Sequence, residues 1–196
     1  MTDPTVDQQV TTLSQSGADT FFNVATPKFA AQAITKIGEL GWKPLHLLNS
    51  ASNSTTAVIR VAGVQHSQGI VSISYLKDPG DPQWDNDQGL KDYKARMAKH
   101  TPGVDPLNSF GVFGFAVAES LVKVLEKTDA PTRDAFQKAL RSMNKVPNSL
   151  LLPGATMTTS ETDGYPVEAA QIQKFTGDRW VLEGKLLDFE GKTKPQ

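Results

Sequence analysis

The first third of the chain alternates short apolar runs with segments of helical periodicity. Apolar residues at positions 6, 10 and 13 recur at helical spacing before Gly17, which predicts a short amphipathic helix. The apolar runs at 20–24 and 45–48 are rich in strand-forming residues and predict two strands. A polar loop at 49–56 and a short helical segment at 56–62 lead to a third apolar run at 69–75, which predicts a third strand.

The segment between the first two runs has the start and stop signals of a helix. Thr26 is the expected N-cap, and Pro27 suits the first helical position because the N–H that it lacks would have no helical partner there. Gly41 is the expected end of the helix. Its apolar stripe comprises Phe29, Ala30, Ala33, Ile34, Ile37 and Leu40. Strands that alternate with helices in this way form a mostly parallel sheet, so the predicted fold class is α/β.

The pattern changes after residue 75. Residues 78–85 are rich in proline and glycine and predict an extended connector. Helical periodicity then returns at 86–99, 108–126 and 133–143. After a polar loop at 157–164, two strands at 167–175 and 180–183 flank Thr-Gly-Asp-Arg, the signature of a hairpin, and a tail follows. The long second helix carries an apolar stripe of Phe113, Val117, Leu121, Val122 and Leu125.

Composition and charge exclude several classes of protein. The chain has 196 residues, a formal net charge of -1 and no cysteine, so disulfides and thiolate chemistry are excluded. The basic stripe that nucleic acids require is absent from the sequence, and no apolar run reaches the ~20 residues of a membrane span. The first residues have neither the basic nor the apolar region of an export signal, so none is expected in the chain as it stands.

Titratable residues suggest neither a metal site nor a catalytic site. The three histidines are too far apart for a zinc motif and are expected in surface positions or loops: His46, His66 and His100. The connector aspartates resemble a calcium loop without its central glycine and terminal glutamate, so they are expected to be solvated: Asp78, Asp81, Asp85 and Asp87. No nucleophile–base pair can be named, and we expect no metal, no cofactor and no enzymatic activity.

The candidate binding residues are those that follow the predicted strands. Ligands of open parallel sheets bind beyond the carboxyl ends of the strands. Ala25 and Thr26 follow the first strand, and Asn49 and Ser50 follow the second. Thr26 also begins a helix, whose free N–H groups suit an anion. The same residue types serve as ordinary caps and turns.

Four segments occur in an order that indicates a family. They are TDPTVDQQVTTLSQSGADTFFNVATPKFAAQAI, GWKPLHLLNS, YLKDPGDPQW and GVFGFAVAESLVKVL. Together they resemble the substrate-binding proteins of branched-chain amino acid ABC transporters, the leucine/isoleucine/valine-binding type, over essentially the whole chain. The resemblance implies the type I periplasmic binding fold, in which two parallel-sheet α/β lobes clamp a ligand.

The resemblance also implies that only the carboxyl-terminal part of this fold is present. Residues 1–74 would belong to lobe two. Residues 75–165 would form a hinge and the carboxyl-terminal portion of lobe one. Residues 166–196 would return to lobe two with the hairpin and the tail. Because the strands under the stripe of the long helix would be missing, we expect that stripe to be uncovered and the chain either to self-associate or to be partly molten.

For the binding site, the resemblance implies ligand contacts at five positions. Amino acid binders of the family have a tyrosine in the loop after the first of these strands and an acidic residue in the loop after the second. Here these loops hold Ala25 and Thr26, and Asn49 and Ser50, while Phe110 matches an aromatic residue at the start of the long helix. The neutral replacements point to a small organic acid in place of an amino acid.

The predicted function is therefore that of a solute-binding component of an ABC importer. The resemblance implies a periplasmic protein that binds a small solute, an amino acid or organic acid, and delivers it to a membrane permease, with no nucleic acid as partner. The alternative is a ligand-sensing domain of a regulator or receptor with the same fold. An α/β enzyme is disfavoured because the sequence offers no catalytic pair.

Overall fold

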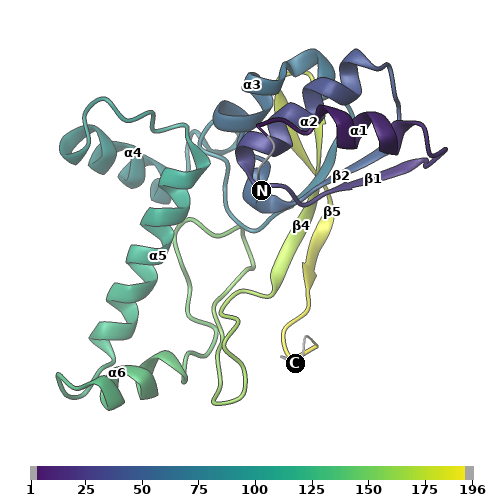
Figure 1. The fold of residues 1–196 in the computed structure, drawn as a ribbon. Helices are drawn as coiled ribbons and strands as arrows, with labels where there is room; N and C mark the ends of the chain where they lie inside the picture. The colour runs from purple at the N-terminus through teal and green to yellow at the C-terminus, as the bar shows by residue number, and fades with distance from the viewer. Residues whose placement is uncertain (1–3, 193–196) are drawn as a thin grey trace. The chain divides into compact units, whose positions relative to one another are not determined.

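The computed structural model describes residues 4–192, so the end of the predicted tail lies outside the described residues (Figure 1). The chain forms two compact units. Of the described residues, the first unit contains 4–74, 107–109 and 172–184, and the second contains 75–106, 110–171 and 185–192. The assignment of segments to the lobes of a larger protein stays a prediction.

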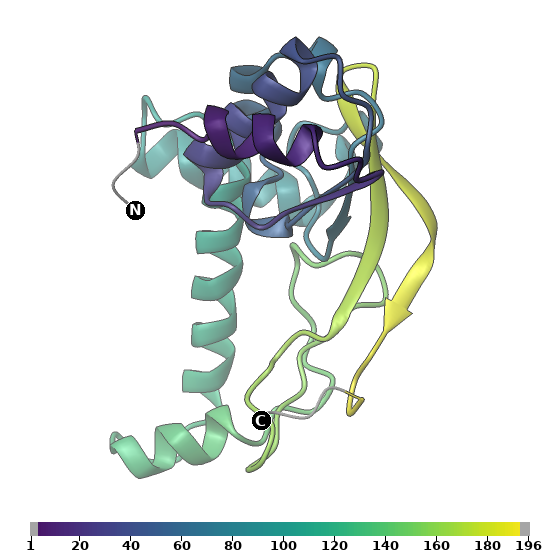
Figure 2. The ribbon, with the colours of Figure 1, turned by 45° about the vertical axis from the view of Figure 1, so that its right-hand side comes forward.

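The strands form one five-stranded sheet in the order β1-β2-β3-β4-β5. β1 pairs with β2 in parallel, and β2 pairs with β3 in parallel, as the alternation of strands and helices predicts. Figure 2 shows β4 and β5 side by side, joined by a two-residue turn in which Gly177 has a φ of +67°. The strands are β1 (Thr20–Asn23), β2 (Leu45–Leu48), β3 (Val71–Ser74), β4 (Ala169–Thr176) and β5 (Arg179–Asp188).

Helices of the first unit cover one face of β1 and β2 (Figure 1). The main helix, α2, buries most of its predicted stripe, whereas Leu40 is 40% exposed because it lies just past the helix end. The predicted helical segment after β2 begins with one turn of π-helix, Thr55–Ile59. The helical elements are α1 (Asp7–Ser14), α2 (Pro27–Glu39), η1 (Ser50–Ser52), η2 (Thr55–Ile59), α3 (Arg60–Ala62) and η3 (Val64–His66).

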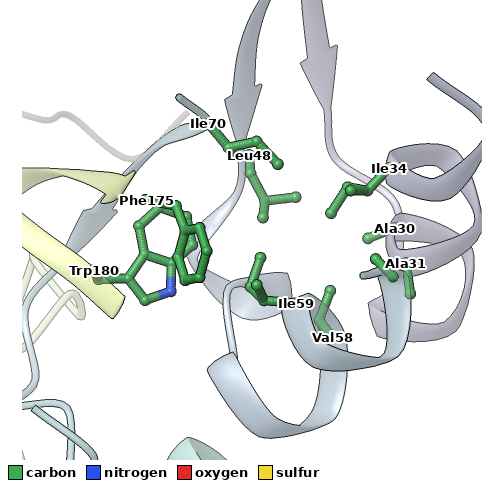
Figure 3. Close-up of a cluster of buried hydrophobic side chains, with 10 residues drawn as sticks. Ala30, Ala31, Ile34, Leu48, Val58, Ile59, Ile70, Phe175 and Trp180 are labelled. Carbon is green, nitrogen blue, oxygen red and sulfur yellow. The ribbon is translucent and has the colours of Figure 1, made fainter. Parts of the chain in front are cut away.

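The core of the first unit forms where the carboxyl-terminal hairpin meets β2, α2, η2 and the residue before β3 (Figure 3). The rings of Phe175 and Trp180 meet edge to face with centroids 5.3 Å apart, against Leu48, Ile59 and Ile70. Phe175 and Ile59 are fully buried. Burial of such a side chain stabilises the fold by ~1.5–3 kcal/mol. The carboxyl-terminal hairpin therefore contributes strongly to the stability of the amino-terminal strands.

The opposite face of the same sheet is apolar and open. Phe22 is 66% exposed, Leu45 52% and Ile73 45%. Alternation along the strands and the register Phe22↔Leu47↔Val71 place these side chains on one face. Parallel sheets are ordinarily covered on both faces. Among the described residues, elements of the first unit cover only one of the two faces of β1, β2 and β3.

The second unit consists mainly of helices and extended segments. The predicted helices are present, although the last ends before Met143, which is buried in a core. Gly111 has a packing reason, since a Cβ there would lie 2.5 Å from the Tyr93 hydroxyl. The helical elements are η4 (Pro82–Trp84), α4 (Gln88–His100), α5 (Ser109–Glu126) and α6 (Arg133–Leu140).

The connector is more ordered than the prediction of a solvated acidic loop. Asp81 is 5% exposed and accepts a hydrogen bond from the Gln83 backbone N–H. Asp87 caps α4 by accepting from the Leu90 N–H and pairs with the buried Lys77 ammonium. The prediction of solvated carboxylates was wrong for these two aspartates. Asp81 accepts hydrogen bonds from Gln83, two residues later, and Asp87 is satisfied by Lys77 and by the first turn of α4.

The apolar stripe of α5 is uncovered, as expected. Each of its five side chains is about half exposed, while the buried face of the helix consists of Val112, Ala116 and Val124. The exposed fractions are Phe113 50%, Val117 50%, Leu121 46%, Val122 51% and Leu125 52%.

Candidate functional site

The carboxyl ends of β1, β2 and β3 meet at one edge of the sheet in the first unit. Because the three strands are parallel, the loops that follow them lie at the same edge. The Asn49 backbone N–H donates to the Asn23 oxygen at 3.0 Å, which holds the first two loops together. The structure therefore brings together Ala25, Thr26, Asn49 and Ser50.

Asn49 has a framework role in this arrangement. Its amide nitrogen donates to the backbone oxygens of Asn23 at 3.0 Å and Ala25 at 3.2 Å. Its amide oxygen accepts from the Ala51 N–H at 2.9 Å. Both amide hydrogens are thus used within the protein, and what Asn49 offers to a solute is limited to the remaining lone pair of its oxygen.

Two further polar residues, Ser52 and Asn53, secure the loop after β2. Ser52 is fully buried and donates to the Ala25 oxygen at 2.7 Å. Asn53 donates to the Ser72 hydroxyl at 3.2 Å and to the Ile73 oxygen at 3.1 Å. Neither residue is among the predicted ligand contacts. The run of small polar residues at 49–54 was the available signal.

Thr26 is the N-cap of α2, but its hydroxyl makes no capping hydrogen bond. The expectation that the hydroxyl caps the helix was wrong: its backbone is extended, while the side chain is exposed. The first turn of α2 contains no acidic residue and does contain Lys28. A helix N-terminus with a free hydroxyl and a nearby ammonium favours a negatively charged group.

The remaining predicted positions differ in what they can offer. Ala25 is half-buried, its N–H donates to Asn23 Oδ1 at 3.2 Å, and its oxygen accepts from Asn49 and Ser52. Ser50 is half-buried at the start of η1. Phe110 belongs to the second unit, in the first turn of α5, and is 45% exposed.

The histidines do not all lie where the sequence suggested. His46 is only 6% exposed and lies on the covered face of β2, so its expected surface position was wrong. Burial lowers the pKa of His46 to about 4. His66 is half-buried and His100 is exposed.

A groove of about 540 Å³ runs beside α5 in the second unit. Its lining is almost wholly apolar, with Phe113, Val117 and Leu121 on one side. Two of its polar members are already paired: Ser120 donates to the Ala116 oxygen at 2.8 Å, and Asn148 donates to the same oxygen at 2.8 Å. The groove therefore has the character of a packing surface more than of a site for a polar solute.

Three carboxylates gather elsewhere in the second unit. Ligand atoms of Asp163, Glu168 and Glu190 all lie within 4.8 Å of one another. The pKa of Glu190 is raised by partial burial and by the neighbouring charges of Glu168, Asp163 and Asp188. Exposed acidic groups often gather without an ion, and we assign no ion to these carboxylates.

Within residues 4–192, no helix combines the length and apolarity that a bilayer span needs.

Comparison with protein families identifies the class to which this α/β fold belongs. A family model described as periplasmic binding protein matches residues 2–179. The chain belongs to the periplasmic binding protein family. Its members are solute-binding proteins and not enzymes, which is the class that the sequence predicted. A comparison with curated protein sequences gave no match.

Solved structures agree on the fold. A branched-chain amino acid ABC transporter protein from Thermus thermophilus with bound valine is 15% identical, with a TM-score of 0.74, over 93% of this chain and 49% of its own. A leucine binding protein, LivK, from Thermotoga maritima is 12% identical, with a TM-score of 0.70, over 96% and 50%. A substrate binding protein of an ABC transporter from Aeropyrum pernix is 16% identical, with a TM-score of 0.75, over 92% and 47%. The chain spans about half the length of these structures.

Proposed function

We propose that this chain forms part of the solute-binding component of an ABC importer, acts in the periplasm and serves a membrane permease. Membership of the periplasmic binding protein family supports this proposal. So does the likeness of fold to solved proteins whose names describe ABC transporter components.

The observation that carries the proposal is the free N-terminus of α2 at the carboxyl edge of the sheet. Thr26 presents an exposed hydroxyl there, and Ser50 begins the neighbouring loop. We assign solute contact to these two side chains and to the free backbone N–H groups of the first turn of α2. Ala25 and Asn49 hold the loops in place, and Phe110 is kept as a predicted contact to the apolar part of the solute.

The solute class follows from the charge of these groups. Thr26, Ser50 and Asn49 offer neutral oxygens, whereas Lys28 and the helix N-terminus favour a carboxylate. The described residues directly after β1 and β2, 24–26 and 49–54, include no carboxylate. The ammonium group of an amino acid would therefore lack a charged partner in these two loops, and burial of an unpaired charge costs several kcal/mol. We therefore propose a small organic acid without an ammonium group.

A matched pair of solutes tests the proposal. L-Leucine and 4-methyl-2-oxopentanoate share a carbon skeleton and differ in whether C2 carries an ammonium or an oxo group. In NMR titrations at millimolar concentration, the oxo acid should shift the amide resonances of Thr26 and Ser50 at lower concentration than leucine does. Thr26→Val should weaken this response, and Thr20→Val, at the other end of β1, should not. Tighter binding of leucine, or no response to either solute, would contradict the proposal.

A further inference from the structure

A buried histidine lies next to the residue that holds the Ala25 loop. His46 on β2 is 6% exposed and Asn23 at the end of β1 is 2% exposed. The Asn23 amide nitrogen lies 3.4 Å from His46 Nε2, and the Phe21 ring packs edge-on against the imidazole with centroids 5.0 Å apart. The pair lies on the face of the sheet that α1 and α2 cover, because Phe21, the register partner of His46, packs against side chains of both helices.

The geometry defines which tautomer is present. An amide nitrogen can only donate, so Nε2 of the neutral ring accepts from Asn23 and the ring proton lies on Nδ1. In this orientation the other end of the amide, Asn23 Oδ1, accepts the Ala25 N–H at 3.2 Å. A neutral His46 is thus compatible with a bonded Ala25 N–H.

Protonation would reverse the requirement at the ring. A protonated imidazole donates from both nitrogens, so Nε2–H would face the Asn23 amide hydrogens. To accept from the ring, the amide must turn over, which removes Oδ1 from the Ala25 N–H. The Ala25 N–H would then face the Asn23 amide nitrogen, which is also a donor, and would lose its hydrogen bond.

Charged groups around His46 do not set its protonation. The covering helices carry Asp7, Lys28, Lys36 and Glu39, and the strand starts are flanked by Asp19 and Lys43. Lys36 pairs with Glu39 at 3.4 Å. Burial is the one cause of the lowered pKa of His46, so the neutral state follows from the enclosure of the ring.

We propose that His46 and Asn23 are positioning residues for the Ala25–Thr26 loop, in which the neutral imidazole holds the Asn23 amide in the orientation that binds the Ala25 N–H. Protonation of the ring releases this loop. The effect on solute affinity rests on the proposed function, because Thr26 is the assigned contact. The effect on the loop itself does not.

NMR spectroscopy of the whole chain tests the loop directly, without a solute. The Ala25 amide resonance should move with the same midpoint, near pH 4, as the His46 ring. In His46→Gln, whose side-chain oxygen accepts from Asn23 at every pH, this movement should vanish. His100→Gln, a change at an exposed position, should leave it intact. An Ala25 resonance that stays still while His46 titrates, or that titrates equally in His46→Gln, would overturn the proposal.

Asn23→Asp supplies a second, independent arm. A carboxylate can accept from both the Ala25 N–H and a protonated ring, so the His46 midpoint should rise by about one pH unit or more and Ala25 should keep its bond. An unchanged midpoint would overturn the proposal even if His46→Gln failed to fold. If the loop responds as described while the oxo acid does not bind, the proposed function fails and the positioning role stands.

Discussion

The Trp180 indole N–H donates a hydrogen bond of 2.8 Å to the backbone oxygen of Asn53, 127 residues earlier in the chain. Trp180 is 3% exposed and packs on Phe175, so the carboxyl-terminal hairpin supports the loop that follows β2. This contact connects the last strands of the chain with the candidate site.

Replacement of Trp180 by phenylalanine should therefore loosen this loop. The change keeps an aromatic ring, leaves the half-buried Asn53 backbone oxygen without its donor, and should cost ~1–3 kcal/mol in the free energy of unfolding. Urea denaturation measures it. Trp42→Phe is the matched control, because the Trp42 indole donates to Ala18 at an exposed position. Equal losses in the two variants would contradict the assigned role.

The buried His46 predicts how stability depends on pH. Its folded pKa of about 4 lies below the ordinary value of 6.5, so between these values the unfolded chain binds more protons. Stability from this group is complete above about pH 6.5 and falls as the pH drops to about 4, by ~3 kcal/mol in all. Denaturation of the natural chain and of His46→Gln at a series of pH values isolates the effect. A constant difference between the two would contradict it.

Two glycines of α5 should respond oppositely to alanine. A Cβ at Gly114 would meet no atom within 4 Å, so Gly114→Ala should stabilise the helix by ~0.5–1 kcal/mol. A Cβ at Gly111 would lie 2.5 Å from the Tyr93 hydroxyl, so Gly111→Ala should be destabilising. Thermal unfolding of both variants checks the signs. Stabilisation by Gly111→Ala would show that the Tyr93 contact is unimportant.

The uncovered stripe of α5 should make the chain associate with further copies of itself. Its five apolar side chains are each about half exposed, and their full burial would contribute ~1.5–3 kcal/mol apiece relative to exposure. Light scattering should give a mass above 21.2 kDa that falls in Val117→Lys and Leu121→Lys. Val104→Lys, at a residue 54% exposed outside the stripe, should not change the mass. A monomer at every concentration would refute the prediction.

Phe110 should contribute to the affinity for the solute. If it contacts the apolar part of the solute, Phe110→Ala should weaken binding by ~1–3 kcal/mol through lost apolar contact. The control is Phe189→Ala, because Phe189 is 46% exposed and Phe110 is 45% exposed. His66→Gln and His100→Gln should also leave affinity unchanged. The titration with 4-methyl-2-oxopentanoate measures all four, and equal affinities for Phe110→Ala and Phe189→Ala would remove Phe110 from the site.

The sequence by itself determined the order of elements and the edge of the candidate site. Thr26 and Pro27 marked the start of α2, and apolar runs marked β1, β2 and β3, because these signals depend on residues that are adjacent in the chain. Parallel strands place their carboxyl ends together whatever their side chains, so Ala25, Thr26, Asn49 and Ser50 could be grouped in advance.

Only the tertiary structure decided which face of each strand is covered. In β2, alternation separates Leu45 and Leu47 from His46 and Leu48, and hydrophobicity alone would bury both leucines of the first pair. The helices cover the other face, so His46 is buried against Asn23 and Phe21, while Leu45 is 52% exposed. Side chains alternate between the two faces of a strand, so the sequence pattern separates the two sets without showing which set is buried. The buried set depends on elements that are distant in the chain.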